Sequence, residues 1–234
     1  MAARRKSEPV ALDSAWRPVI EGALFFGAAI VAVRLWRDGA IFPSQDATWL
    51  IPLTWIVAAV IATWPLWAPS RDLFTLPQWF GASWAGSIRP VAWLSVLVLM
   101  PFAAAYLLYQ GWWRGLSIVP AAPQHWGGLL FYQFVYVAFP EELFFRGYLQ
   151  QRFDDVFGRP YRVFGAPCGA GLLMANLLFA AGHVLATDDV ARLDVFFPGL
   201  LFGWLLARTG SLIAPMLFHG LCNLLLFTLQ AWVQ

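Results

Sequence analysis

The chain has 234 residues, of which 60% are hydrophobic and only 12% carry a charge. A soluble domain is about one quarter charged, so this composition excludes an ordinary soluble globular protein. The net charge of +2 is too small to indicate a nucleic-acid partner. The two cysteines, Cys168 and Cys222, lie in separate apolar runs, which argues against a disulfide framework or a cysteine-based zinc site.

Long apolar runs recur along the whole chain, and a helix of about 20 such residues can cross the bilayer core. In chain order, the predicted membrane spans are residues 18–37, 49–67, 90–113, 126–150, 163–187 and 209–234, with a further apolar segment at 195–207. This further segment is short, and a tilted, a re-entrant or a merely buried helix would each account for it. The predicted fold class is all-α, a polytopic transmembrane bundle of about seven helices.

The distribution of basic residues predicts the orientation. Lys and Arg are concentrated in the amino-terminal segment and in the loops on its side, so we expect a cytoplasmic amino terminus. The first 18 residues are polar and the apolar run after them is long enough to remain as an anchor, which is not typical of a cleaved signal peptide. We expect a multi-pass protein in contact with the lipid bilayer, in the cytoplasmic membrane if the source is bacterial.

The two halves of the chain differ in where their ionisable residues lie. In residues 1–125, with about three spans, these residues cluster at the ends of the spans, where arginine and tryptophan favour the membrane interface. In residues 126–234, polar side chains lie inside apolar helices: Glu141, Glu142, Arg146, Asn176, His183, His219 and Asn223. An unpartnered charge in the membrane costs about 3 kcal/mol or more, so these residues are candidates for function. We therefore expect the chemistry in the second half.

The stretch FPEELFFRGYLQ, residues 139–150, holds three of these charges. Glu142 and Arg146 are four residues apart, so on a helix they share a face and an ion pair is expected. Glu141 points about 100° away from Glu142 and has no local cation, which makes it the candidate for proton transfer. Pro140 tends to kink the helix and to open room for water. Alternatively, the three charges only hold helices together.

Two further polar pairs lie in separate apolar helices. In NLLFAAGHVL, Phe179 precedes His183 by four residues, and in MLFHGLCNLL, His219 precedes Asn223 by four. A single histidine in an apolar helix is more often a core residue than a base. Together, however, a carboxylate, two imidazoles and an amide on three helices are sufficient for hydrolysis, because they supply a base for water and donors for an oxyanion.

These pieces, in this order, resemble the CPBP family of intramembrane proteases, which includes the Rce1-type CAAX prenyl endopeptidases. The family motif EExxxR is present at residues 141–146 and FxxxH at residues 179–183. The third motif, His followed four residues later by Asn or Asp, is present at residues 219–223. The resemblance covers about residues 126–230 and implies transmembrane helices packed around a membrane-embedded polar active-site cavity.

The resemblance also implies the activity and a role for each motif residue. The activity would be that of a glutamic-type intramembrane endopeptidase, whose substrate is a membrane peptide or protein such as a carboxy-terminal anchoring or sorting tail. Glu141 and His183 would activate water, His219 and Asn223 would stabilise the oxyanion, and Glu142 with Arg146 would hold the site together. A zinc metalloprotease is the alternative mechanism, with Glu141, His183 and His219 as the metal ligands. We expect no obligatory metal, because a Glu–His pair alone can generate the nucleophile.

Two other classes of protein use buried Glu, His and Arg. A transporter usually shows related halves with broken helices, and the sequence has no such repeat. A non-catalytic membrane partner remains an alternative, such as a bacteriocin-immunity-like protein or an accessory factor of a protein-sorting system.

The predicted site also requires a particular arrangement of two helices. His183 lies near the end of its helix and Glu141 midway along a longer one, so they meet only if that helix is tilted or kinked, or if 187–194 dips inward.

Overall fold

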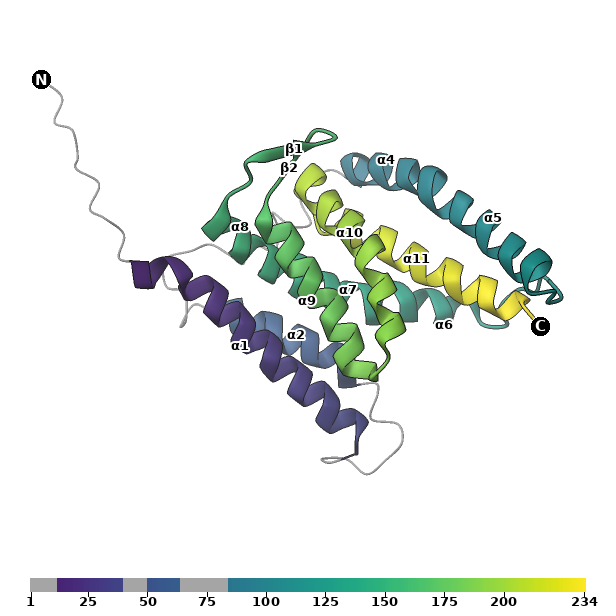
Figure 1. The fold of residues 1–234 in the computed structure, drawn as a ribbon, viewed down its shortest axis with the longest axis horizontal. Helices are drawn as coiled ribbons and strands as arrows, with labels where there is room; N and C mark the ends of the chain where they lie inside the picture. The colour runs from purple at the N-terminus through teal and green to yellow at the C-terminus, as the bar shows by residue number, and fades with distance from the viewer. Residues whose placement is uncertain (1–11, 40–49, 64–83) are drawn as a thin grey trace, which may run out of the picture.

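The computed structural model describes residues 12–39, 50–63 and 84–234, which are mostly helical (Figure 1). The elements before residue 125 are α1 (Leu12–Arg37), α2 (Leu50–Thr63), α4 (Trp84–Leu94), η2 (Ser95–Leu99), α5 (Met100–Leu108) and η3 (Tyr109–Trp113). The π-helices η2 and η3 continue α4 and α5, so residues 84–113 form one rod.

The second half begins with another rod, residues 126–157, made of α6 (Trp126–Leu130), η4 (Phe131–Ala138), α7 (Phe139–Glu142), η5 (Leu143–Gln150) and α8 (Gln151–Phe157). The strands β1 (Tyr161–Val163) and β2 (Ala166–Cys168) follow. The chain continues with α9 (Ala170–Thr187), the 3₁₀-helix η6 (Val190–Val195), α10 (Phe196–Thr209) and α11 (Ile213–Trp232). Both η4 and η5 are π-helical, so half of the rod that carries Glu141 is wound in wide turns.

In the described part of the chain, five helical segments are long and apolar enough to cross a membrane. They are Trp16–Arg37, Gly86–Trp113, Ala170–Thr187, Val190–Thr209 and Ile213–Trp232. The shorter apolar helix Ile51–Ile61 lies within the predicted span 49–67, whose last four residues are outside the described ranges, as is the polar segment 1–11. The polytopic helical bundle predicted from the sequence is confirmed.

Three predicted segments differ in the structure. The predicted span 126–150 lies in the longer rod 126–157, which is not among these five candidate spans. The predicted span 163–187 begins too early, because residues 161–168 form an antiparallel hairpin and the helix starts only at Ala170. Pro167 and the glycines on either side of it disfavour a helix there. The short segment 195–207 is part of a 20-residue helical run, Val190–Thr209, and so is long enough to span. The small hairpin departs from the predicted all-α class, as does an isolated antiparallel bridge between Ile118 and Val233.

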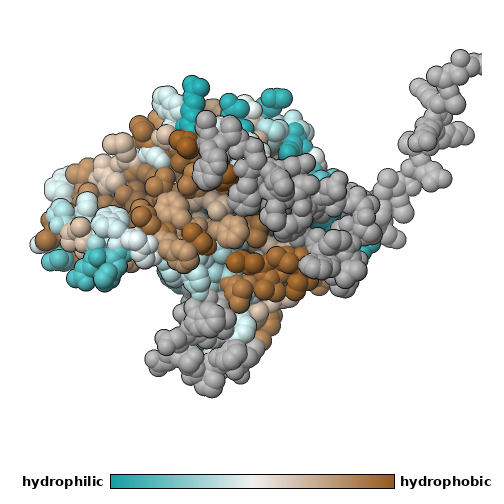
Figure 2. All heavy atoms as spheres, turned by 180° about the vertical axis from the view of Figure 1, so that it is seen from behind, coloured by the Kyte–Doolittle hydropathy of each residue, from teal (hydrophilic) through white to brown (hydrophobic). Residues whose placement is uncertain are grey.

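The outer surface of the protein is apolar over a wide area, as expected for a protein in a lipid bilayer. Figure 2 shows a broad hydrophobic face between polar patches at the top and at the lower left. The rod 84–113 is the extreme case, since only 6% of its most apolar stretch is buried and Trp112 is 85% exposed. An exposed apolar surface of this extent marks contact with a membrane.

One hydrophobic core joins both halves of the chain. α1 and α2 pack side by side against η5 and α8, while α9 and α10 pack over η5, and α11 lies between η4, α10 and the rod 84–113 (Figure 1). The ring of Trp55 on α2 lies 5.2 Å from that of Phe144 and 5.0 Å from that of Phe145, both on η5. The first half of the chain therefore packs directly behind the EExxxR motif.

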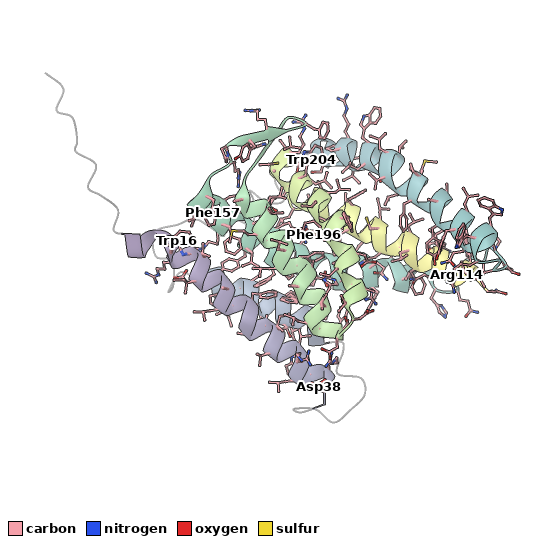
Figure 3. The ribbon with its side chains drawn as sticks, viewed as in Figure 1. Trp16, Asp38, Arg114, Phe157, Phe196 and Trp204 are labelled. Carbon is pink, nitrogen blue, oxygen red and sulfur yellow. The ribbon has the colours of Figure 1, made fainter. Side chains whose placement is uncertain are left out.

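Ion pairs fix α1 at both ends. Near its start, Glu21 accepts a hydrogen bond from the mostly buried Arg152 of α8 at 2.8 Å, and Trp16 packs edge-on against Phe157 (Figure 3). Near its end, Arg34 donates to Asp188 at 2.6 Å. Asp188 follows α9 directly, so this ion pair ties α1 to the helix that carries His183.

Candidate active site

Three separate helices bring one carboxylate and two imidazoles together. Glu141 comes from α7, His183 from α9 and His219 from α11. The Oε2 atom of Glu141 lies 3.8 Å from Nε2 of His183 and 3.9 Å from Nε2 of His219. It is buried and has no hydrogen-bond partner within the described part of the chain. These separations are too long for direct hydrogen bonds and suit a water molecule between the groups.

His183 is held by the other residue of its motif. Its Nδ1 lies 3.0 Å from the backbone oxygen of Phe179, and the two rings pack edge to face at 4.5 Å. A carbonyl oxygen only accepts hydrogen bonds, so Nδ1 carries the proton. Nε2 of the neutral ring then faces Glu141 as an acceptor. Phe179 therefore determines both the position and the tautomer of His183.

Glu142 lies between Arg146 and His219. Its Oε1 accepts from Nη1 of Arg146 at 3.1 Å and lies 2.7 Å from Nδ1 of His219. A carboxylate paired with a guanidinium accepts only, so Nδ1 of His219 is the donor and its Nε2 faces Glu141. The ion pair expected from the sequence is present, and it has a second partner that the spacing of EExxxR does not indicate. Glu142 therefore orients His219 as well as neutralising Arg146.

Arg146 is enclosed by residues of α7, α9 and α10. It is 1% exposed, and its Nη2 donates to the backbone oxygen of Gly199 on α10 at 3.0 Å and to Asn176 Oδ1 on α9 at 3.4 Å. Its guanidinium carbon lies 4.2 Å from the ring centroid of Phe179. Burial of an ion pair is tolerated only when further hydrogen bonds offset the loss of hydration, and these contacts supply them. Arg146 thereby connects η5 with α9 and α10, and through Glu142 with α11.

Sequence reasoning missed the glycines of α10 that make these contacts possible. Gln150 donates to the backbone oxygen of Gly203 at 3.1 Å, one turn along from the contact between Arg146 and Gly199. A Cβ on Gly199 would overlap Asn176 Oδ1 and lie 3.0 Å from Nη2 of Arg146, and a Cβ on Gly203 would lie 2.8 Å from Oε1 of Gln150. The pattern G-x-x-x-G at residues 199–203 is the signal, because it is typical of close helix approach in membranes.

Asn223 is the one residue of the predicted catalytic set that has no polar contact with the clustered side chains. It lies one turn beyond His219 on α11, is half-buried, and makes no hydrogen bond to the other described residues. His219 itself is 4% exposed and stacks on Phe202 with ring centroids 4.6 Å apart. Among the clustered side chains, that of His183 is the most exposed, at 26%. The site is therefore most accessible beside α9.

The metal alternative would use the same three side chains that meet at this site. The described ranges contain no group of three or more His, Cys, Asp or Glu side chains arranged to hold a metal ion. The predicted zinc ligands Glu141, His183 and His219 do lie together, and Glu142 already accepts the Nδ1 proton of His219, as partners of a ligating histidine do. The chelator experiment described below tests metal dependence directly.

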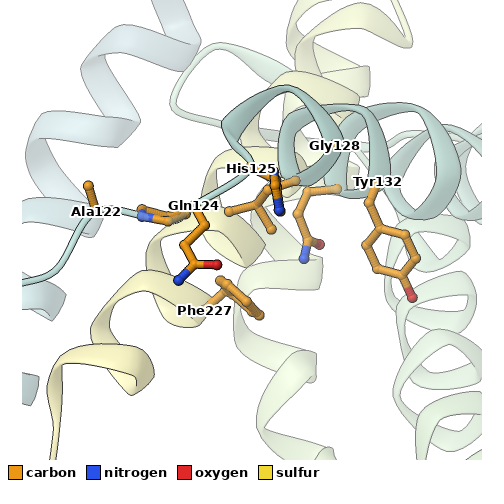
Figure 4. A pocket seen from close by; sticks show the side chains of 9 residues that line it. Ala122, Gln124, His125, Gly128, Tyr132 and Phe227 are labelled. Atoms are coloured by element: carbon orange, nitrogen blue, oxygen red, sulfur yellow. The ribbon is translucent and has the colours of Figure 1, made fainter.

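An open hollow lies away from this cluster, between η4, α11 and the loop before α6 (Figure 4). Its volume is about 660 Å³, and its lining consists of Ala122, Pro123, Gln124, His125, Gly128, Leu129, Tyr132, Gln133 and Phe227. None of the clustered polar residues lines it. We therefore assign the candidate active site to the carboxylate–histidine cluster on chemical grounds and not to this hollow.

The bundle and its buried polar cluster define a multi-pass membrane protein with a carboxylate and two imidazoles at one site. Residues 123–225 match the family model of the type II CAAX prenyl endopeptidases, Rce1-like. This match confirms the resemblance that the three motifs carry, and the CAAX protease family implies protease activity. No curated protein and no solved structure matches the chain.

Proposed function

We propose that this protein is an intramembrane endopeptidase in which Glu141 removes a proton from the attacking water. The observation that carries the proposal is the position of Glu141 Oε2, 3.8 Å and 3.9 Å from two imidazole nitrogens that both face it. A water molecule between these atoms can donate one proton to the carboxylate and the other to an imidazole. Its oxygen lone pair is then free to attack a carbonyl carbon.

The protein's own groups account for each proton in the reaction. As the water oxygen bonds to the carbonyl carbon, its proton passes to Glu141, while His183 holds the water through Nε2. Collapse of the tetrahedral intermediate breaks the C–N bond, and the proton on Glu141 passes to the leaving amine. The Glu141 carboxylate is thereby restored, and the products are a new carboxylic acid and a new amino terminus. The acid then ionises by giving the second proton of the water to the new amine or to solvent.

We assign the stabilisation of the oxyanion to His219, with Asn223 as a second donor. Nε2 of His219 faces Glu141 and donates when the ring carries a proton on both nitrogens, while the Glu142 carboxylate at 2.7 Å holds the proton on Nδ1. Asn223 lies one turn away, and its amide is not engaged by the other described residues. Donors aimed at a developing negative charge are strongest where water is scarce, as within this buried cluster.

We expect the substrate to be a peptide segment in or near the bilayer, such as a carboxy-terminal anchoring or sorting tail. The cluster is enclosed by five elements whose outer surfaces are apolar, and a soluble protein would not reach it. Such a segment must be extended at the cleaved bond, because a helix engages its own carbonyl groups in hydrogen bonds. The substrate's backbone therefore has to unwind beside α9, where His183 is accessible.

The test compares membranes from cells that produce the wild-type protein and the Glu141→Gln variant at matched levels. We expect specific carboxy-terminal fragments in the peptidome of the wild type and their loss in the variant, because removal of a general base lowers rates by about 10²–10⁴-fold. A chelator added to the reconstituted wild-type protein provides the metal control, and retained cleavage supports the metal-free mechanism. If Glu141→Gln keeps the full cellular function, the protein acts as a non-catalytic membrane partner instead.

A further inference from the structure

The β1–β2 hairpin projects from the end of the bundle where α8 ends, α9 begins and α10 ends (Figure 1). Its two strands pair Tyr161 with Cys168 and Val163 with Ala166. The indole nitrogen of Trp204, near the end of α10, donates to the backbone oxygen of Val163 at 2.8 Å (Figure 3). The hairpin is therefore fixed relative to the membrane-spanning helices.

The turn of this hairpin has an unusual residue. Phe164 and Gly165 connect the strands, with φ angles of 46° and 81°. A two-residue turn with positive φ at both positions favours Asn, Asp or Gly, and a bulky side chain there is strained. The Phe164 side chain does not offset that strain by packing, because the residue is 89% exposed. This bulky apolar ring is thus directed away from the protein.

The surface around Phe164 combines apolar and basic side chains. Tyr161 is 69% exposed and Val163 43%, and alternate residues of a strand share one face. Arg162 projects from the opposite face of β1. Arg208, at the end of α10, places its guanidinium carbon 3.8 Å from where a side chain on Gly165 would begin. Neither arginine has an ion-pair partner in the part of the chain that the structure describes.

We propose that the hairpin is an interfacial anchor that inserts Phe164 and Tyr161 into the headgroup region while Arg162 and Arg208 bind the phosphates of anionic lipids. The bilayer surface is the occupant that the structure favours, because the candidate spans on both sides begin at Ala170 and end at Thr209. Aromatic side chains favour this interface and arginines favour anionic headgroups. The proposal is independent of the proposed protease activity.

The depth of the turn can be measured directly. In a background with Cys168→Ala and Cys222→Ala, Phe164→Cys is labelled with bimane and the full chain is reconstituted into phosphatidylcholine vesicles containing phosphatidylglycerol. We expect quenching by lipids brominated near the headgroup and protection from aqueous iodide. Quenching by iodide alone would overturn the proposal and would point to a soluble partner or substrate as the occupant.

A second pair of variants separates the ring from the turn. Phe164→Asn suits the backbone conformation but removes the ring, whereas Phe164→Trp keeps an interfacial aromatic group. We expect phosphatidylglycerol to raise the melting temperature of the wild type and Phe164→Trp, and this gain to be lost in Phe164→Asn and in Arg162→Gln/Arg208→Gln. An equal gain in all four proteins contradicts the proposal, as does a loss of stability of Phe164→Asn in detergent, since the ring would then pack within the protein.

Discussion

The rod 84–113 and helix α11 are both apolar spans that pack against each other, yet they differ in what they bury. The mean hydropathy of the rod is 2.2 and that of α11 is 1.5, while the buried share of the same stretches is 6% and 39%. The more hydrophobic span is the less buried one, because lipid is as good a surrounding for its side chains as protein. High hydropathy thus identifies a span, and a partnered polar residue identifies a span with a function.

Polar contacts distinguish the same two regions. On α11, His219 is engaged by Glu142, which is itself paired with Arg146, and this network continues to Asn176 and the backbone of α10. On the rod, Arg89 is exposed near one end. If this contrast is correct, substitutions in the network should cost far more stability than equivalent substitutions on the rod or at the ends of α1.

The largest loss is expected from Arg146→Ala. The variant leaves Glu142 buried without its counter-charge, and breaking a buried ion pair costs about 3–5 kcal/mol. Thermal unfolding in detergent micelles measures the effect, with Arg89→Ala on the rod as the matched control. Equal stability of the two variants would mean that the network does not hold the helices together.

A smaller loss is expected from Gly199→Ala, because the new methyl group meets Asn176 and Arg146. Overpacking of this kind costs about 1–3 kcal/mol. Gly27→Ala is the control, since a Cβ on Gly27 of α1 has no neighbour within 4 Å, and a change of this kind in a helix can stabilise by up to about 1 kcal/mol. The two alanines should therefore change the unfolding midpoint in opposite directions.

The smallest effect is expected at the end of α1. Hydrogen bonds from Arg34 and Arg37 keep the pKa of Asp188 below its ordinary value. A depressed pKa in the folded state adds stability above the unfolded pKa, and this stability is lost as the pH falls through the folded value. Asp188→Asn should therefore be slightly less stable than the wild type at neutral pH and equally stable in strong acid. A difference that persists in acid would contradict an electrostatic origin.

The sequence predicted the helical bundle, and its spacing of four residues predicted the contact between Glu142 and Arg146. Asn223, which was predicted to share the site, makes no hydrogen bond to the other described residues. The sequence left open how Glu141 and His183 could meet, and the rod of Glu141 proves to be wound in π-helical turns on both sides of Pro140. Spacing could not show that Glu142 also engages His219, since that contact joins residues 77 positions apart.

The hairpin was missed for a related reason. Residues 161–168 are apolar enough to continue the next span, and only Gly165 and Pro167 indicate otherwise. A hydropathy average does not register a single proline or glycine, whereas the backbone conformation depends on both. Gly199 and Gly203 were also visible as a pattern, but their partners on η5 could be identified only once α10 was placed beside it.

The most direct test of the account compares two adjacent carboxylates, Glu141→Gln and Glu142→Gln, in the same reconstituted membranes. Unfolding midpoint and cleavage of a substrate recovered from the peptidome are measured for both. The account predicts that Glu141→Gln keeps the wild-type midpoint and loses cleavage, whereas Glu142→Gln lowers the midpoint because Arg146 loses its counter-charge. Cleavage at the wild-type rate by Glu141→Gln would contradict it.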